Sequence, residues 1–93
     1  IDSNDRRLKY YRGVLLVLQG NKPSQAELLL KSYLATVPNN SDLPSHASAQ
    51  EWLGRLHESQ RRYSEAAQQY RISLTLDPHN KSVEEALKRV ERK

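Results

Sequence analysis

The stretch Gln50-Glu51-Trp52-Leu53-Gly54, which continues to Asp77-Pro78, decides the fold of this chain. Apolar residues recur at helical spacing before the turn at residues 60–62, and again after it. Proline has no N–H and disfavours helix in the residue before it, so Asp77-Pro78 ends the second segment. The stretch is therefore predicted to form two helices joined by a tight turn.

Gly54 lies inside the first of these two segments. A glycine within a helix costs about 1 kcal/mol relative to alanine. We expect the compensation to be space, because a neighbouring helix can approach closely where there is no Cβ. Ala66 is small and lies on the facing helix of the predicted hairpin, so it is the expected neighbour.

A weaker copy of the stretch lies upstream. At an offset of 40 residues, five identities fall within one predicted helix and its proline stop. They pair Ser24, Ala26, Leu34, Pro38 and Asn40 with Ser64, Ala66, Leu74, Pro78 and Asn80. Before that helix the offset is 41, since Gly13 then matches Gly54 and Leu15 matches Leu56. Two helical hairpins in tandem, with one extra residue in the first turn, are the simplest interpretation.

These residues resemble the tetratricopeptide repeat family, which repeats about every 34 residues and ends each repeat with a proline. Residues 47–80 carry Leu53-Gly54, Ala66, Tyr70 and Pro78 at the places where the family has its leucine–glycine pair, alanine, aromatic residue and proline. They depart from the family pattern at Gln50 and at Ser73. Residues 6–40 fit the pattern more loosely, through Gly13, Ala26, Leu30 and Pro38.

The resemblance implies an all-α fold of two tandem helix-turn-helix hairpins and a C-terminal capping helix, arranged as an α-solenoid. We expect one domain over residues 1–93. Its parts are a repeat over 6–40, an inserted loop over 41–46, a second repeat over 47–80 and a terminal helix over 81–93. The last helix is amphipathic, and its polar face suits the end of a stack, although it could equally begin a third repeat.

The first predicted helix, about residues 5–19, contains five consecutive apolar residues from Val14 to Leu18. A helix that is apolar all round is buried on more than one side, and its hairpin partner covers only one. An upstream repeat, a second copy of the chain or a ligand would have to cover the rest. Because Leu15 aligns with core Leu56, we expect Val14, Val17 and Leu18 to point outward and to support self-association.

The resemblance also implies a binding face. In this family the first helix of each hairpin lines a concave surface that binds extended peptides or a helix of a partner. The corresponding groove residues are Tyr10, Tyr11, Val14, Glu51, Trp52, Arg55, Glu85 and Arg89. Tyr11 and Trp52 would lie side by side as interface anchors, although Trp52 could instead pack between helices.

Two acid–base pairs in this set have the i, i+4 spacing that places side chains on one helix face. They are Glu51 with Arg55, and Glu85 with Arg89. Acid before base is the favourable order, worth about 0.2–0.5 kcal/mol per pair. The pairs either satisfy each other or leave Arg55 and Arg89 as a basic track for carboxylates.

Composition excludes several classes of function. The net charge is +4, but glutamates such as Glu51, Glu58 and Glu84 interrupt the basic residues along the chain, so a contiguous nucleic-acid-binding face is not expected. The three histidines lack the spacing of a metal pair, and no catalytic or phosphate-binding motif is found, which favours a non-enzyme without metal or cofactor. A protein or peptide partner is expected instead.

The location of the protein is constrained only weakly. There are no cysteines, no run of apolar residues long enough to cross a bilayer and no signal-peptide pattern. These features favour the cytoplasm and argue against insertion into a membrane. The first residue is Ile and not Met, which suggests that the sequence is a piece of a longer protein.

Overall fold

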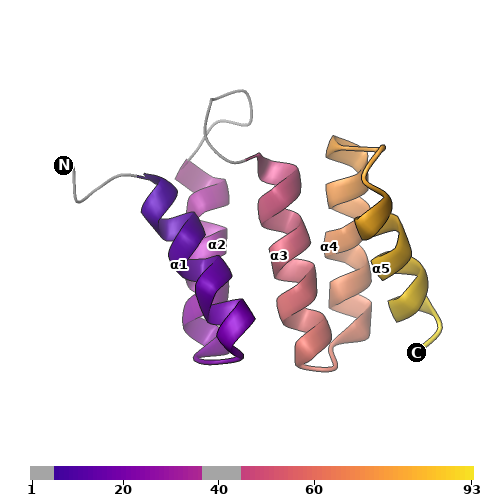
Figure 1. The fold of residues 1–93 in the computed structure, drawn as a ribbon, viewed down its shortest axis with the longest axis horizontal. Coiled ribbons are helices and arrows are strands. Elements are labelled where there is room, and N and C mark those ends of the chain that lie inside the picture. Colours follow the sequence, from indigo (N-terminus) through magenta and orange to yellow (C-terminus); the bar gives the residue numbers. More distant parts are fainter. Residues whose placement is uncertain (1–5, 37–44) are drawn as a thin grey trace.

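The computed structural model describes residues 6–36 and 45–93 (Figure 1). The described residues form five α-helices and no strand, which confirms the all-α prediction. The helices are α1 (Arg6–Gln19), α2 (Pro23–Thr36), α3 (His46–Ser59), α4 (Tyr63–Leu76) and α5 (Lys81–Glu91). None of them is long and apolar enough to cross a membrane.

The expected inserted loop over residues 41–46 is shorter at its C-terminal end than predicted. Ser45 is already the N-cap of α3, because its side-chain oxygen accepts a hydrogen bond from the backbone N–H of Ser48 at 3.1 Å. His46 is the first helical residue. Residues 41–44 lie outside the described part of the chain.

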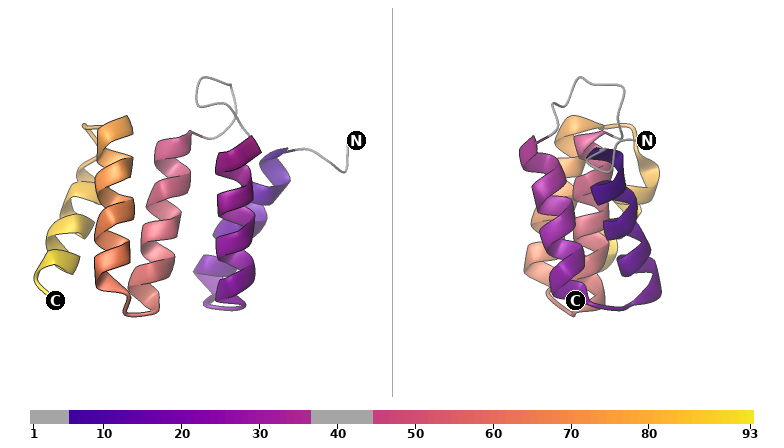
Figure 2. Two further views of the ribbon diagram at one scale, coloured as in Figure 1. Left: turned by 180° about the vertical axis from the view of Figure 1, so that it is seen from behind. Right: turned by 90° about the vertical axis from the view of Figure 1, so that its left-hand side faces the viewer.

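The helices are arranged in two layers. α1, α3 and α5 lie on one side and α2 and α4 on the other, as the side view in Figure 2 shows. Each helix packs against the next one in the sequence, and α1 also contacts α3. This stacking of two antiparallel hairpins and a terminal helix is the α-solenoid arrangement that the sequence predicted.

Two clusters of buried side chains hold the stack together. The first joins the α1–α2 hairpin to α3 through Tyr10, Ala26, Leu30, Tyr33, Ala49, Leu53 and Leu56. The second joins α4 to α5 through Ala66, Ala67, Tyr70, Val83, Ala86 and Val90. The side chain of Asn80 caps α5 by accepting from the backbone N–H of Val83 at 3.2 Å.

Gly13 and Gly54 each leave room for a side chain of the facing helix in their hairpin. A Cβ on Gly54 would lie 2.5 Å from Cε1 of Tyr70, and a Cβ on Gly13 would lie 2.8 Å from Cγ of Leu30. Leu30 and Tyr70 are themselves related by the 40-residue offset, so both hairpins use the same contact. Gly54 makes room as expected, but the side chain that fills the space is Tyr70 and not Ala66.

The outward side of α1 differs from the prediction. Leu15 is 53% exposed and Leu18 is 67% exposed, whereas Val14 and Val17 pack against the first buried cluster. The two valines therefore do not belong to the outward set, and Leu15 is not a core residue. Its counterpart Leu56 is buried because the preceding hairpin covers it, while the described residues place no helix on the corresponding side of α1.

The contact at Gly54 gives a stability prediction. Gly54→Ala should lower the free energy of unfolding by about 1–2 kcal/mol, because overpacking against a rigid ring costs more than the helix propensity that alanine adds. Urea denaturation measures the change. The loss should shrink when Tyr70→Leu is introduced first, because a flexible side chain then faces the new methyl group. A Gly54→Ala variant as stable as the parent would contradict this account.

Candidate functional site

All of the predicted groove residues lie on α1, α3 and α5, which form one layer and are called the first-helix face below. The predicted groove residues on α1 fall into two groups according to how exposed they are. Tyr10 is buried, and its hydroxyl hydrogen-bonds the hydroxyl of Ser48 on α3, while Val14 is half-buried against the same core. Tyr11 is 55% exposed and meets the Tyr10 ring edge-on, with the ring centroids 5.2 Å apart. Tyr10 and Val14 therefore join α1 to α3, and Tyr11 remains accessible.

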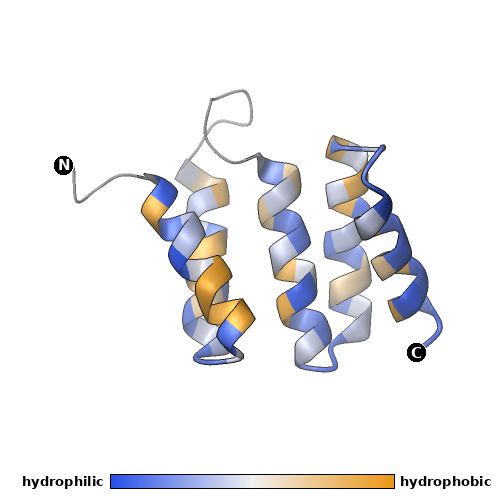
Figure 3. Ribbon diagram, viewed as in Figure 1, coloured by the Kyte–Doolittle hydropathy of each residue, from blue (hydrophilic) through white to orange (hydrophobic). Residues whose placement is uncertain are grey.

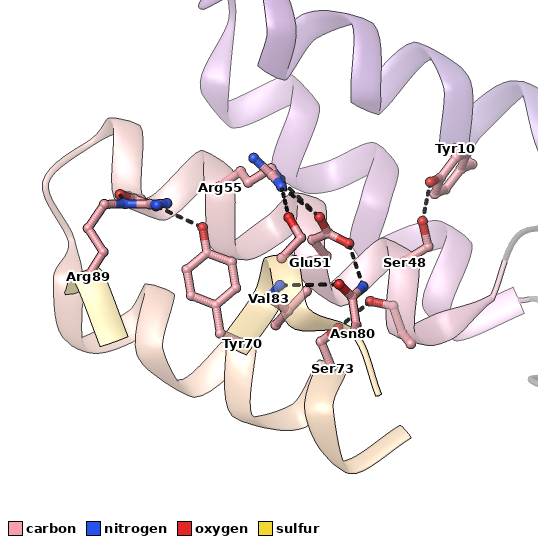
Figure 4. Close-up of polar contacts among 12 residues, drawn as sticks. Tyr10, Ser48, Glu51, Arg55, Tyr70, Ser73, Asn80, Val83 and Arg89 are labelled. Atoms are coloured by element: carbon pink, nitrogen blue, oxygen red, sulfur yellow. Dashed lines mark hydrogen bonds and ion pairs between the residues drawn. The ribbon is translucent and has the colours of Figure 1, made fainter. Parts of the chain in front are cut away.

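The centre of the face is built on α3. Arg55 donates from Nε and Nη2 to one carboxylate oxygen of Glu51, at 3.2 and 2.8 Å, so this predicted i, i+4 pair is present. The same Nη2 donates to the hydroxyl of Ser82 on α5 at 3.3 Å. The guanidinium also lies 5.3 Å from the centroid of the half-buried Trp52 ring. Arg55 is thus fixed by three neighbours, and its contact with Glu51 is shown in Figure 4.

The second predicted pair, Glu85 with Arg89, is replaced by a contact between helices. Arg89 donates to both carboxylate oxygens of Glu58 on α3, at 2.6 and 2.8 Å. The hydroxyl of buried Tyr70 donates to the same carboxylate at 2.8 Å. A two-pronged, charge-assisted contact that Tyr70 supports is stronger than an exposed pair along one helix, which explains the exchange of partner.

This cluster shifts two acid–base equilibria. The hydrogen bond from Arg89 lowers the pKa of Glu58 from its ordinary value of 4.5, partial burial opposes that shift, and the Tyr70 bond adds to it. Burial is the main reason why the pKa of Tyr70 is raised, and its bond to Glu58 acts in the same direction. Both shifts favour the charged carboxylate and the neutral phenol that make the contact.

Polar contacts therefore join each first helix to the next across the face. Tyr10 reaches Ser48 between α1 and α3, and both Arg55 and Glu58 of α3 reach side chains of α5 (Figure 4). The two arginines that the sequence offered as a basic track are paired with Glu51 and Glu58. The face combines aromatic surface at Tyr11 and Trp52 with arginines whose charges are paired with glutamates of the same face.

His57 has a buried setting beside two glutamates that no sequence pattern indicated. Its side chain is only 3% exposed, and Nε2 lies 3.7 Å from a carboxylate oxygen of Glu27 on α2 and of Glu65 on α4. These three residues share no regular spacing in the sequence, so no motif could bring them together. Within the described ranges, no group of three or more acidic, histidine or cysteine side chains is placed to hold a metal ion.

Comparison with known proteins supports the resemblance on which the fold was predicted. Residues 39–81 match the family model described as tetratricopeptide repeat. The match includes all of α3 and α4, the pair of helices that the opening stretch encodes. A search of curated proteins and a search of solved structures found no match to the chain.

The Glu58 cluster predicts a pH-dependent contribution to stability. The pKa of Glu58 is lower in the folded state, so its contribution is present above the ordinary value of 4.5 and is lost as the pH falls below it. Glu58→Gln should therefore lower the free energy of unfolding at pH 7, and the difference from the parent should shrink at acid pH. Denaturation curves across that range measure it.

Glu91→Gln is the matched control, because it removes a more exposed ion pair, the 3.0 Å contact with Arg71. Exposed pairs contribute about 0–1 kcal/mol, so this variant should change stability little at either pH. Equal effects of the two substitutions at every pH would contradict the importance given to Glu58.

Proposed function

Because residues 39–81 belong to the tetratricopeptide repeat family, whose repeats generally mediate protein–protein interactions and are typically non-catalytic scaffolds, we propose that this chain is a protein-interaction scaffold. The five helices of residues 6–36 and 45–93 act as one domain. A peptide or helix of a partner protein binds on the first-helix face, and no catalytic step or cofactor is involved.

The observation that carries the proposal is the fixed pair of Trp52 and Arg55. Tryptophan and arginine are the residue types most enriched among the side chains that dominate binding energy. Here Glu51 and Ser82 hold the guanidinium beside the ring before any partner arrives. Because Trp52 and Arg55 are already held in place, their side chains lose little conformational entropy when a partner binds, which favours affinity.

The same charges favour protein over nucleic acid as the partner. Arginine and lysine side chains that bind a phosphate backbone release the counterions condensed on the nucleic acid, and a protein carboxylate already beside such a side chain weakens this contact. Arg55 and Arg89 are each held by a glutamate. A peptide that contacts aromatic surface and matched charges suits this face better than an oligonucleotide does.

Self-association through α1 is the alternative function. Its support is the exposed leucines of α1, since a second copy of the chain would remove them from water. Its weakness is charge, because α1 contains four basic residues and no acidic one, so two copies would bring only cations to the shared contact. Light scattering over a concentration series measures this alternative directly.

A crosslinking experiment tests the proposed face. A photo-reactive phenylalanine derivative at Tyr11, which preserves an aromatic ring, should capture the partner when the chain is expressed in cells. The same group at Thr75, an exposed residue of α4 in the opposite layer, should not. Equal capture at both positions would place binding elsewhere.

Trp52→Ala then separates binding from folding. Against the purified captured partner, this change should weaken binding by about 2 kcal/mol or more, the scale of a dominant interface residue. Titration calorimetry measures the affinity, and thermal denaturation measures the stability lost with the half-buried ring. Unchanged affinity together with a much lower melting temperature would show that Trp52 acts only in the core.

A further inference from the structure

One side of α1 carries a regular apolar row, here called the α1 stripe. Leu8, Tyr11, Leu15 and Leu18 are 39%, 55%, 53% and 67% exposed. Their spacing of three, four and three residues is the heptad pattern by which one helix packs along another. Figure 3 shows hydrophobic residues gathered along this helix, whereas α5 at the opposite end of the stack is largely hydrophilic.

A cleft of about 270 Å³ between α1 and α2 adjoins the stripe. Its walls are Arg12, Leu15, Leu16, Lys22, Gln25 and Leu29. Leu15 belongs to both the stripe and the cleft, so the two form one continuous surface, here called the α1–α2 end face. The cleft gives this surface a depression that can receive a side chain.

Positive charge borders this apolar surface. Arg12 and Lys22 are both exposed, and within the described residues neither forms an ion pair with a carboxylate. Residues 6–36 contain six basic side chains and a single acidic one, Glu27. Glu27 is already engaged by Lys31 at 2.7 Å and lies beside His57. Within the part of the chain that the structure describes, the carboxylates that would complement this end face are therefore missing from it.

We propose that the α1–α2 end face docks an amphipathic helix of a partner protein whose apolar stripe is flanked by aspartate or glutamate. Its apolar residues pack along Leu8, Tyr11, Leu15 and Leu18, one of them enters the cleft, and its carboxylates pair with Arg12 and Lys22. A second copy of α1 offers the apolar residues but no carboxylate. Tyr11 belongs to both surfaces, so capture at Tyr11 alone does not distinguish them. Trp52 on α3 belongs only to the first-helix face and Leu15 and Leu18 only to the α1–α2 end face, so substitutions there let either site fail without the other.

Designed peptides test the proposal on the whole chain. The first probe is a peptide of about three heptads with leucine at the heptad seam and glutamate at the positions beside it. The control probe keeps every leucine and replaces the glutamates with lysine. Fluorescence anisotropy should show one-to-one binding of the acidic probe, and the lysine probe should bind at least about tenfold more weakly, because like charges oppose each other.

Variants of exposed residues locate the site. Leu15→Ser with Leu18→Ser, and separately Arg12→Glu with Lys22→Glu, should each weaken binding of the acidic probe at least about tenfold. Ile72→Ser removes a comparably exposed apolar residue from α4, and Lys81→Glu reverses a charge at the start of α5. Both controls should leave the affinity unchanged, and circular dichroism verifies that every variant is folded.

Salt separates the charge contribution from the apolar one. Raising the ionic strength from about 0.1 M to about 1 M shortens the screening length from about 10 Å to about 3 Å. Affinity for the acidic probe should fall over this range, and affinity for the lysine probe should not.

Three results would overturn the proposal. The first is that the acidic probe does not bind, and the second is that the two probes bind equally. The third is a molecular mass in light scattering that rises with concentration and returns to that of the monomer in the Leu15→Ser, Leu18→Ser variant. That last result would assign the α1–α2 end face to a second copy of the chain.

Discussion

The ring of Tyr70 lying against Gly54 is the contact on which the rest of the structure depends. The missing Cβ lets a large aromatic side chain fill the space between α3 and α4, where Tyr70 is fully buried. The buried ring carries its hydroxyl to Glu58, and Glu58 in turn holds Arg89 of α5. One glycine thus fixes the helix spacing, and through it the polar contact that joins the terminal helix to the first-helix face.

The hairpins were predictable because local rules determine them. The period of the apolar residues, the stop at Asp77-Pro78 and the matched glycines all act within one or two helices, and α3 and α4 are found where these signals place them. Ser73, a departure from the family pattern, is also explained by a contact: it is buried, and its hydroxyl donates to the backbone carbonyl of Ala47 on α3 at 2.7 Å.

Contacts between helices were not predictable in the same way. The i, i+4 rule predicted Glu85 as the partner of Arg89. That rule considers residues of a single helix, whereas the actual partner, Glu58, lies on α3. Leu15 was predicted to be buried because it aligns with Leu56. Burial depends on the neighbouring helices, and the two leucines have different neighbours. His57 was passed over for the same reason, since its two carboxylate neighbours come from different hairpins. Packing of whole elements decides these cases.

The two ends of the described stack differ in the surface that each presents to solvent. α5 buries Val83, Ala86 and Val90 against α4 and turns its charged side chains to the outside. Molecules whose opposite ends attract each other join head to tail, and such contacts continue into open filaments unless a rotation closes them. In this stack the apolar side chains exposed on α1 have no exposed apolar counterpart on α5 within the described residues. Copies of the described helices therefore lack the complementary end surfaces that head-to-tail contact requires.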